Sequence, residues 1–276
     1  MMLSIKINSI PQNQLQQYIH YTLRIAVAMC FIGHGAFGVI TKPIWCNYFA
    51  VFGIEQGLAY QLMPIVGDID IILGVFMLIY PVRAIPAWLV IWGLFTALLR
   101  PLSGEPVAEL VERAGNFGAP LALLLMAGIP KHFKQWFERM DPRQQVPADN
   151  IQQLSVCLKV IVFLLLAGHG WLNIIGKKGL VTQYAALGFP NPVQAAEIIG
   201  IAEVAAGIII LFRPVRYFVF IVFLWKMISE LFYPKYEIFE WIERGGSYGT
   251  LLALWMVTAR RSFFKMNRPH LQLNEQ

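Results

Sequence analysis

Two histidines, each flanked by glycines, lie inside apolar stretches of this sequence. CFIGHGAFGVITK contains His34, and LAGHGWLNIIGKK contains His169. A neutral imidazole can ligate a metal or a haem iron, or hydrogen-bond the carbonyl oxygen of a quinone. Glycines on both sides narrow a helix, so that another backbone or a flat ligand can approach it. We therefore take both histidines as candidate cofactor-binding residues, and as iron ligands if a haem is bound.

The alternative is that each imidazole bonds a carbonyl or a carboxylate within its own half of the chain. Glu112 and Glu243 are the expected partners, and each is followed by an arginine, Arg113 and Arg244. These four residues either complete the ligand site or form ion pairs that hold the helices together. The sequence leaves both interpretations open.

Other charged residues also fall within apolar stretches. A charged side chain near the centre of a bilayer costs at least about 2.5–3.5 kcal/mol, so each one needs a partner or a function. Lys226 is placed to pair with Glu203. The further intramembrane polar residues are Asp70, Arg100, Glu203, Lys226 and Glu230.

The composition is that of a membrane protein. Of the 276 residues, 57% are hydrophobic and only 14% are charged, whereas soluble domains carry about 25% charged residues. The net charge of +6 comes from basic residues in short segments between apolar runs, which is typical of topology signals and not of nucleic-acid binding. Three scattered cysteines without a Cys-x-x-Cys pair argue against dithiol chemistry.

These polar residues are carried by apolar segments. A helix needs about 20 mostly apolar residues to cross a bilayer, and the sequence predicts an all-α polytopic protein with eight transmembrane helices. The distribution of Lys and Arg places both termini on the cytoplasmic side of the cell (inner) membrane. The predicted spans are Tyr21–Ile40, Leu58–Tyr80, Arg83–Leu102, Val107–Ile129, Ile151–Ile175, Pro192–Phe212, Pro214–Tyr233 and Glu237–Val257.

The two halves of the chain repeat each other. Besides the Gly-His-Gly segments, GDIDIILGVFMLIYPVR recurs as GIAEVAAGIIILFRPVR, and ERAGNFG recurs as ERGGSYG, in the same order. We assign residues 1–130 to a first four-helix repeat and 131–150 to a cytoplasmic linker. Residues 151–276 form a second repeat with a basic cytoplasmic tail. Four spans per unit make the two repeats, and hence the two four-helix bundles, parallel. The linker segment KHFKQWFERM has the apolar spacing of a surface helix.

The two units resemble the DoxX-like family of membrane proteins. The shared features are a basic residue at the start of the first helix (Arg24, Lys159), the segments GHGAFGVITK and GHGWLNIIGKK, and the second-helix segments GDIDIILG and GIAEVAAG. The resemblance covers nearly the whole chain as two fused units. It implies a four-helix fold for each unit, and it implies a link to redox systems, since the family includes a small subunit of a thiosulfate:quinone oxidoreductase.

Three functions are weighed. The first is a redox-associated membrane protein, a component of a quinone-linked oxidoreductase, that binds a quinone or haem b between its repeats and works with a redox partner subunit. The second is a non-enzymatic binding or assembly module for a lipid, a small apolar ligand or a partner subunit. The third, a channel or carrier lined by Asp70, Glu203 and Lys226, is disfavoured because no broken half-helices are predicted. Oligomerisation is left open.

Overall fold

The computed structural model describes residues 11–232 and 238–266. Within these ranges the regular secondary structure is helical, apart from an isolated β-bridge between Val82 and Arg139. The helices of the first half are α1 (Gln12–Val39), α2 (Trp45–Ala50), α3 (Gln56–Ile79), α4 (Ala84–Leu102), α5 (Val107–Glu112) and α6 (Ala114–Ala127).

The second half follows after a short 3-10 helix, η2 (Phe133–Trp136). Its helices come in the same order of long and short elements as those of the first half. They are α7 (Ala148–Ile174), α8 (Lys178–Ala186), α9 (Pro192–Phe212), α10 (Arg216–Leu231), α11 (Ile238–Glu243) and α12 (Gly245–Met266).

Prolines begin several of these helices. Pro11, Pro106 and Pro147 occupy the residue before α1, α5 and α7, and Pro192 is the first residue of α9. The proline ring fixes φ near its helical value, and the missing N–H has no partner to lose in a first turn. The side chain of Asn191 also caps α9 by accepting a hydrogen bond from the backbone N–H of Gln194.

Five helices of the described chain are long and apolar enough to cross a membrane: α1, α3, α4, α7 and α9. Helices α1 and α7 are more buried than the other three. The outward faces of α3, α4 and α9 carry large apolar side chains such as Ile69, Ile91 and Ile201, each at least half exposed. An exposed apolar surface of this kind matches a hydrocarbon environment.

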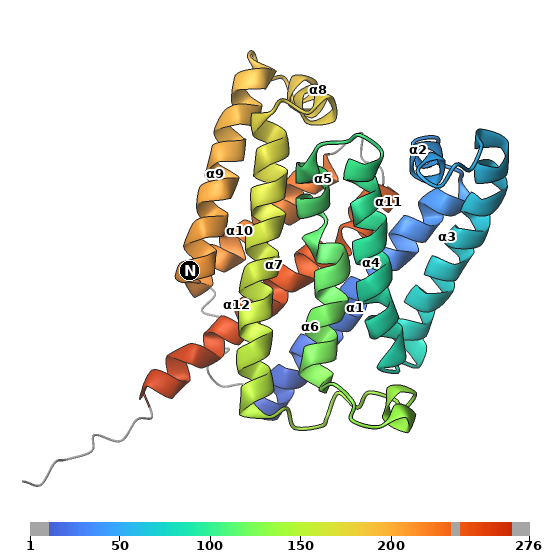
Figure 1. The fold of residues 1–276 in the computed structure, drawn as a ribbon. Helices are drawn as coiled ribbons and strands as arrows, with labels where there is room; N and C mark the ends of the chain where they lie inside the picture. Colours follow the sequence, from blue (N-terminus) through green and yellow to red (C-terminus); the bar gives the residue numbers. More distant parts are fainter. Residues whose placement is uncertain (1–10, 233–237, 267–276) are drawn as a thin grey trace, which may run out of the picture.

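The first helix of each half packs against both halves. Helix α1 packs along α3 of its own half and against α11 and α12 of the other half, while α7 packs along α9 and against α5 and α6. Helices α6 and α12 also contact each other. In Figure 1, α1 and α7 both begin at the lower end of the molecule and finish in its upper half, where the short helices α2, α5, α8 and α11 also lie.

Three local features differ from the sequence-based expectations. The spans predicted at 107–129 and 237–257 are interrupted at Arg113 and Arg244, so that each consists of one short and one longer helix. The short helices α2 and α8 follow α1 and α7. The linker forms only the 3-10 turn η2, and its bridge to Val82 and the hydrogen bond from Met140 N to Pro81 O tie it to the α3–α4 turn.

Candidate functional site

The glycines beside the histidines are positions of close backbone contact. A methyl group added at Gly33 would overlap the backbone of Glu243, and one added at Gly168 would overlap the backbone of Glu112. On the other side of each histidine, Gly35 faces the backbone of α3 and Gly170 faces the backbone of α9. In both segments the first glycine therefore serves the contact between the halves, and the second serves the contact within one half.

The first histidine belongs to a three-residue polar group. His34 Nδ1 lies 2.8 Å from Asp70 Oδ2, and the indole N–H of Trp92 donates to Asp70 Oδ1 at 2.8 Å. The ring of Trp45 stacks at a tilt on the imidazole, with 4.7 Å between centroids. Asp70 is fully buried. The carboxylate thus fixes the imidazole orientation, and Nε2 is the ring nitrogen left for a ligand.

The second histidine has the same arrangement. His169 Nδ1 lies 2.5 Å from Glu203 Oε2, and the indole N–H of Trp225 donates to Glu203 Oε1 at 3.3 Å. Its Nε2 lies 3.6 Å from Glu230 Oε1. Asn173 adds an amide next to Glu203, and the hydroxyl of Tyr184 donates to Asn173.

The expected partners of the histidines were therefore wrong in identity. Each imidazole does bond a carboxylate of its own half, but the carboxylate is Asp70 or Glu203 and not Glu112 or Glu243. The physical reason is that α1 crosses α3 closely, and α7 crosses α9 closely, at paired glycines. The acid lies about one helix turn away from each crossing, and the close approach of the helices places it beside the imidazole.

The tryptophans and the short-helix tyrosines were not predicted as site residues. A sequence signal existed for the tryptophans, because Trp92 and Trp225 each follow the acid of their half at a separation of 22 residues. Tyr48 and Tyr184 lie on α2 and α8, outside the predicted spans. Burial raises the pKa of both phenols, so each hydroxyl stays protonated and acts as a hydrogen-bond donor. The Tyr48 hydroxyl donates to Glu105 at 2.6 Å.

His34 lines a cavity of about 700 Å³ that is formed by the first half. Its walls are rich in aromatic rings, which include Trp45, Phe52 and Phe95, and its polar lining includes Arg100, Arg113 and Asn116. His169 lines a separate cavity of about 680 Å³ formed by the second half. The structure therefore does not bring the two imidazoles together on one iron. Among the described residues, it also has no group of three or more His, Cys, Asp or Glu side chains arranged to hold a metal ion.

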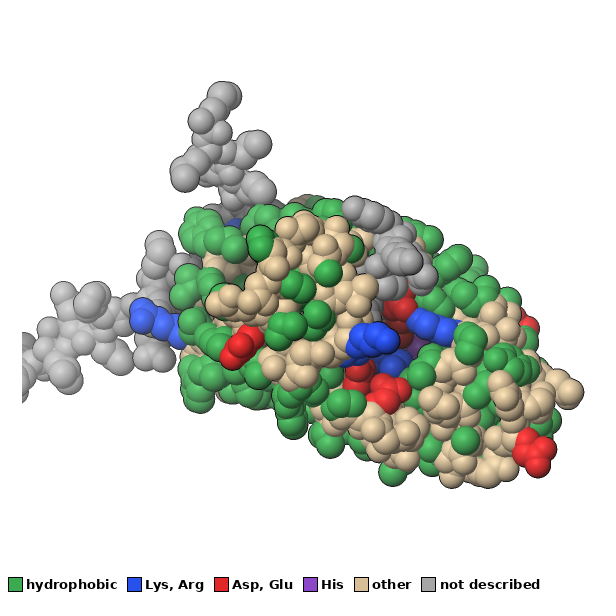
Figure 2. Space-filling model, turned by 90° about the horizontal axis from the view of Figure 1, so that it is seen from above, with side chains coloured by type: hydrophobic (Ala, Val, Ile, Leu, Met, Phe, Trp, Pro, Cys, Tyr) green, Lys and Arg blue, Asp and Glu red, His purple; other side chains and the backbone are tan. Residues whose placement is uncertain are grey.

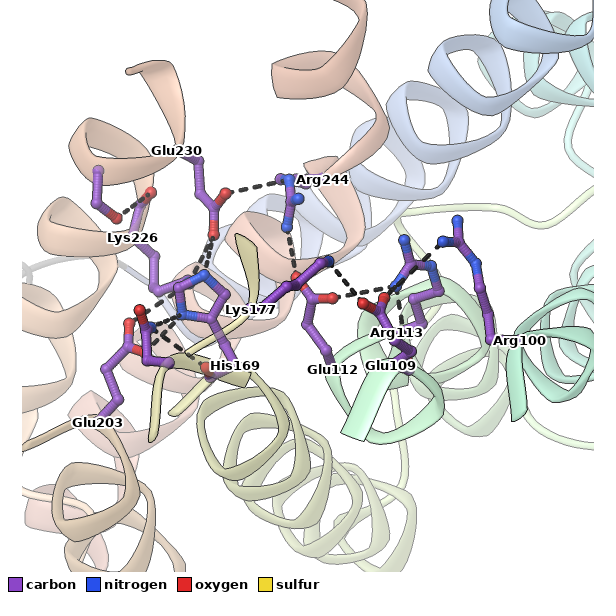
Figure 3. Close-up of polar contacts among 12 residues, drawn as sticks. Arg100, Glu109, Glu112, Arg113, His169, Lys177, Glu203, Lys226, Glu230 and Arg244 are labelled. Carbon is purple, nitrogen blue, oxygen red and sulfur yellow. Dashed lines mark hydrogen bonds and ion pairs between the residues drawn. The ribbon is translucent and has the colours of Figure 1, made fainter. Parts of the chain in front are cut away.

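Most of the charged residues singled out from the sequence, but not Asp70, form a network that joins the halves (Figure 3). Arg244 bridges Glu230 Oε2 at 3.1 Å and Glu112 Oε1 of the first half at 2.7 Å. Lys226 Nζ lies 2.6 Å from Glu230 and 3.5 Å from Glu203, which confirms the expected pairing with Glu203.

The same network continues through the first half. Arg113 pairs with Glu112 at 3.0 Å and with Glu109 at 2.8 Å, and Arg100 pairs with Glu105 at 3.2 Å. Arg100 and Arg113 also line the first cavity, so the network runs from one cavity to the other. Of the four residues proposed beside the histidines, Glu112, Arg113 and Arg244 are in these ion pairs, while the backbone of Glu243 packs against Gly33.

Two lysines form matching contacts between the halves. Lys42 pairs with Glu240 of the second half, and Lys177 Nζ lies 2.6 Å from Glu109 of the first half. These are the lysines that follow each Gly-His-Gly segment. Viewed from the end that carries the short helices, Lys or Arg and acidic side chains gather in a hollow, with a histidine visible inside it (Figure 2).

We expect Lys177→Met to lower the free energy of unfolding only slightly, by about 1 kcal/mol or less. The Lys177 side chain is 27% exposed and thus partly screened, and its buried partner Glu109 keeps Arg113 as a second counter-charge at 2.8 Å. Denaturant titration of the purified protein in detergent would measure the change. Lys42→Met should behave in the same way, and a loss of several kcal/mol in either variant would show that these lysines are main determinants of the contact between the halves.

No known protein family, curated protein or solved structure matches the chain. The fold and the site therefore define its class. Over the described residues it is an all-helical protein with several membrane-crossing candidates, in which each of two cavities is lined by a histidine and a tryptophan and the histidine bonds a buried carboxylate.

Proposed function

We propose that this protein is an integral membrane protein that binds the headgroup of a quinone-type molecule in the first cavity. The observation that carries the proposal is that His34 and Trp92, both bonded to the buried Asp70, line an aromatic-rich cavity. A concave, mostly apolar lining with a few convergent polar groups is typical of small-molecule binding. The ligand position is thus within the first half, instead of between the two repeats.

The proposed architecture is eight spans in two parallel four-helix repeats. In addition to the five long apolar helices, α10, the pair α5–α6 and the pair α11–α12 would complete the crossings. The equal order of elements in the two halves and the parallel course of α1 and α7 support this assignment (Figure 1). Arg83, Lys131, Arg139 and Arg216 lie near the turns and the linker opposite the short helices, which favours a cytoplasmic location of that end in the inner membrane.

The cavity residues supply what a flat dicarbonyl ligand needs. Aromatic rings such as Trp45 and Phe95 offer faces for stacking. The imidazole of His34, which Asp70 orients, offers Nε2 as a hydrogen-bonding and proton-holding group. Arg100, Arg113 and Asn116 offer further N–H donors to carbonyl oxygens. A haem would need an iron ligand, and His34 is the only histidine among the described residues that line this cavity.

The test is binding of a decyl-substituted benzoquinone to the purified protein in lipid nanodiscs, measured by quenching of tryptophan fluorescence. We expect Asp70→Asn to weaken binding about 10–100-fold, because a charge-assisted hydrogen bond of about 1.5–3 kcal/mol no longer orients the imidazole. Extraction of the protein as purified from membranes would show whether a quinone accompanies it.

His169→Gln is the matched control, since it alters the equivalent residue of the other cavity. It should leave benzoquinone binding unchanged, and an equal loss in both variants would contradict a site in the first half. A Soret band in the purified protein that disappears in His34→Ala would show that the ligand of the first cavity is a haem and not a quinone. Binding of the benzoquinone without reduction by any membrane dehydrogenase would favour the second candidate function, a non-enzymatic binding module.

A further inference from the structure

The two cavities carry opposite charges on their walls. Among the described residues, the lining charges of the first cavity are Arg100 and Arg113, together with the imidazole of His34. The second cavity is lined by Glu203 and Glu230, together with His169. The first cavity is therefore rich in hydrogen-bond donors, and the second is rich in acceptors. Although the halves share the histidine–acid–tryptophan group, the linings of their cavities therefore differ in charge and in hydrogen-bonding character.

The two carboxylates of the second cavity differ in how many further hydrogen bonds they can accept. Glu203 is engaged on both oxygens, since Oε1 contacts Trp225 and Lys226 and Oε2 contacts His169 and Asn173. For Glu230, the described contacts are those of Oε1 with Lys226 and His169 and of Oε2 with Arg244. A carboxylate accepts about four hydrogen bonds, so Glu230 retains acceptor capacity toward the cavity.

Gln183 provides a second acceptor on the same wall. Its Nε2 donates to the backbone oxygen of Ser229 at 3.0 Å, which leaves Oε1 as the accepting atom of the amide. The cations that balance Glu230 are Lys226 and Arg244. Neither is among the described residues that line the cavity. A ligand in the cavity can therefore contact these acceptors directly, whereas the cations that balance Glu230 lie outside the cavity lining.

The remaining wall of the second cavity is mostly apolar, and the donors of its polar members Tyr184, Trp225 and Ser229 are already bonded to other groups of the protein. Its apolar part is formed by aliphatic and aromatic side chains, namely Leu187, Phe189, Ile199, Ile228 and Phe232. A concave, mostly apolar lining of this kind is typical of small-molecule sites. The combination of an apolar wall and a recessed pair of acceptors fits an apolar molecule with one donating polar end.

We propose that the second cavity is a separate binding site for an alkylated phenol, whose single hydroxyl hydrogen is shared between the acceptors Glu230 and Gln183. The reduced headgroup of a quinone belongs to this chemical class, because it presents hydroxyls where the oxidised form presents carbonyls. The proposal rests on the lining of the second cavity alone. It stands or falls separately from benzoquinone binding in the first cavity.

The test compares two probes that differ only in the donor. 4-Heptylphenol and its methyl ether, 4-heptylanisole, are titrated into the wild-type protein in nanodiscs, with empty nanodiscs as the blank for partitioning into lipid. We expect the phenol to bind with at least about tenfold higher affinity than the ether, because the ether leaves buried acceptors without a donor. Equal affinities of the two probes would overturn the proposal.

Two variants locate the site. Gln183→Leu and Glu230→Gln should each weaken phenol binding about tenfold and leave the affinity for the ether within twofold of wild type. Gln183 is on the short helix α8, outside the ion-pair network, so its variant provides a test even if Glu230→Gln does not fold. Asp70→Asn, in the first cavity, should leave phenol binding unchanged. Loss of phenol binding in Asp70→Asn, with none in Gln183→Leu, would overturn the assignment to the second cavity.

Discussion

Replacing Gly168 by alanine is expected to prevent assembly of the two halves. The added methyl group would overlap backbone atoms of Val111 and Glu112, which cannot move away as the end of a flexible side chain could. Inserting atoms into a close-packed contact costs about 1–3 kcal/mol and sometimes more, and backbone contact is at the upper end of this range. We therefore expect a loss of about 3 kcal/mol or more, seen as a loss of monodisperse protein in size-exclusion chromatography.

Gly33→Ala should have the same effect, because its methyl group would overlap the backbone of Glu243. Gly57→Ala is the matched control, since no atom lies within 4 Å of its added methyl group and its φ is not in the left-handed region. That variant should be as stable as the wild type, or more stable by up to about 1 kcal/mol from helix propensity. Wild-type yield of Gly33→Ala and Gly168→Ala would contradict the contact between the halves described above.

Replacing Lys226 by methionine is expected to lower the free energy of unfolding by about 3–5 kcal/mol. Lys226 is 1% exposed and lies between Glu203 and Glu230. Without the ammonium group, two buried carboxylates lose a shared counter-charge. Unfolding of the detergent-solubilised protein by sodium dodecyl sulfate, followed by circular dichroism, would measure the loss.

A double variant separates charge from packing. Lys226→Met combined with Glu230→Gln removes one positive and one negative charge together, and we expect it to recover part of the stability lost in the single variant. Lys131→Met, at an exposed linker position, should be neutral. If the double variant were less stable than Lys226→Met alone, the effect of Lys226 would come from its packing and not from its pairing.

The residues of the site could be chosen from the sequence, but most of their partners could not. His34 and His169 were identified from their flanking glycines, and Lys226 was paired with Glu203. The partners Asp70 and Glu203 of the histidines were missed, because their contact depends on which face of α1 meets α3, and that face is set by Gly35 and Gly67 at the crossing. The interruptions at Arg113 and Arg244 were missed because each Glu-Arg pair and its neighbouring polar residues were taken into one span with the apolar residues that follow.

The sequence by itself determined a helical, apolar chain, since hydropathy and charge placement depend only on residue types. It also determined that the Gly-His-Gly segments, the acids and the Glu-Arg pairs occur twice, in the same order. Only the tertiary structure decided that the histidines line separate cavities and that Lys42 and Lys177 reach across to the other half. These contacts join residues far apart in the chain, so they depend on helix crossing angles and depths that no local pattern encodes.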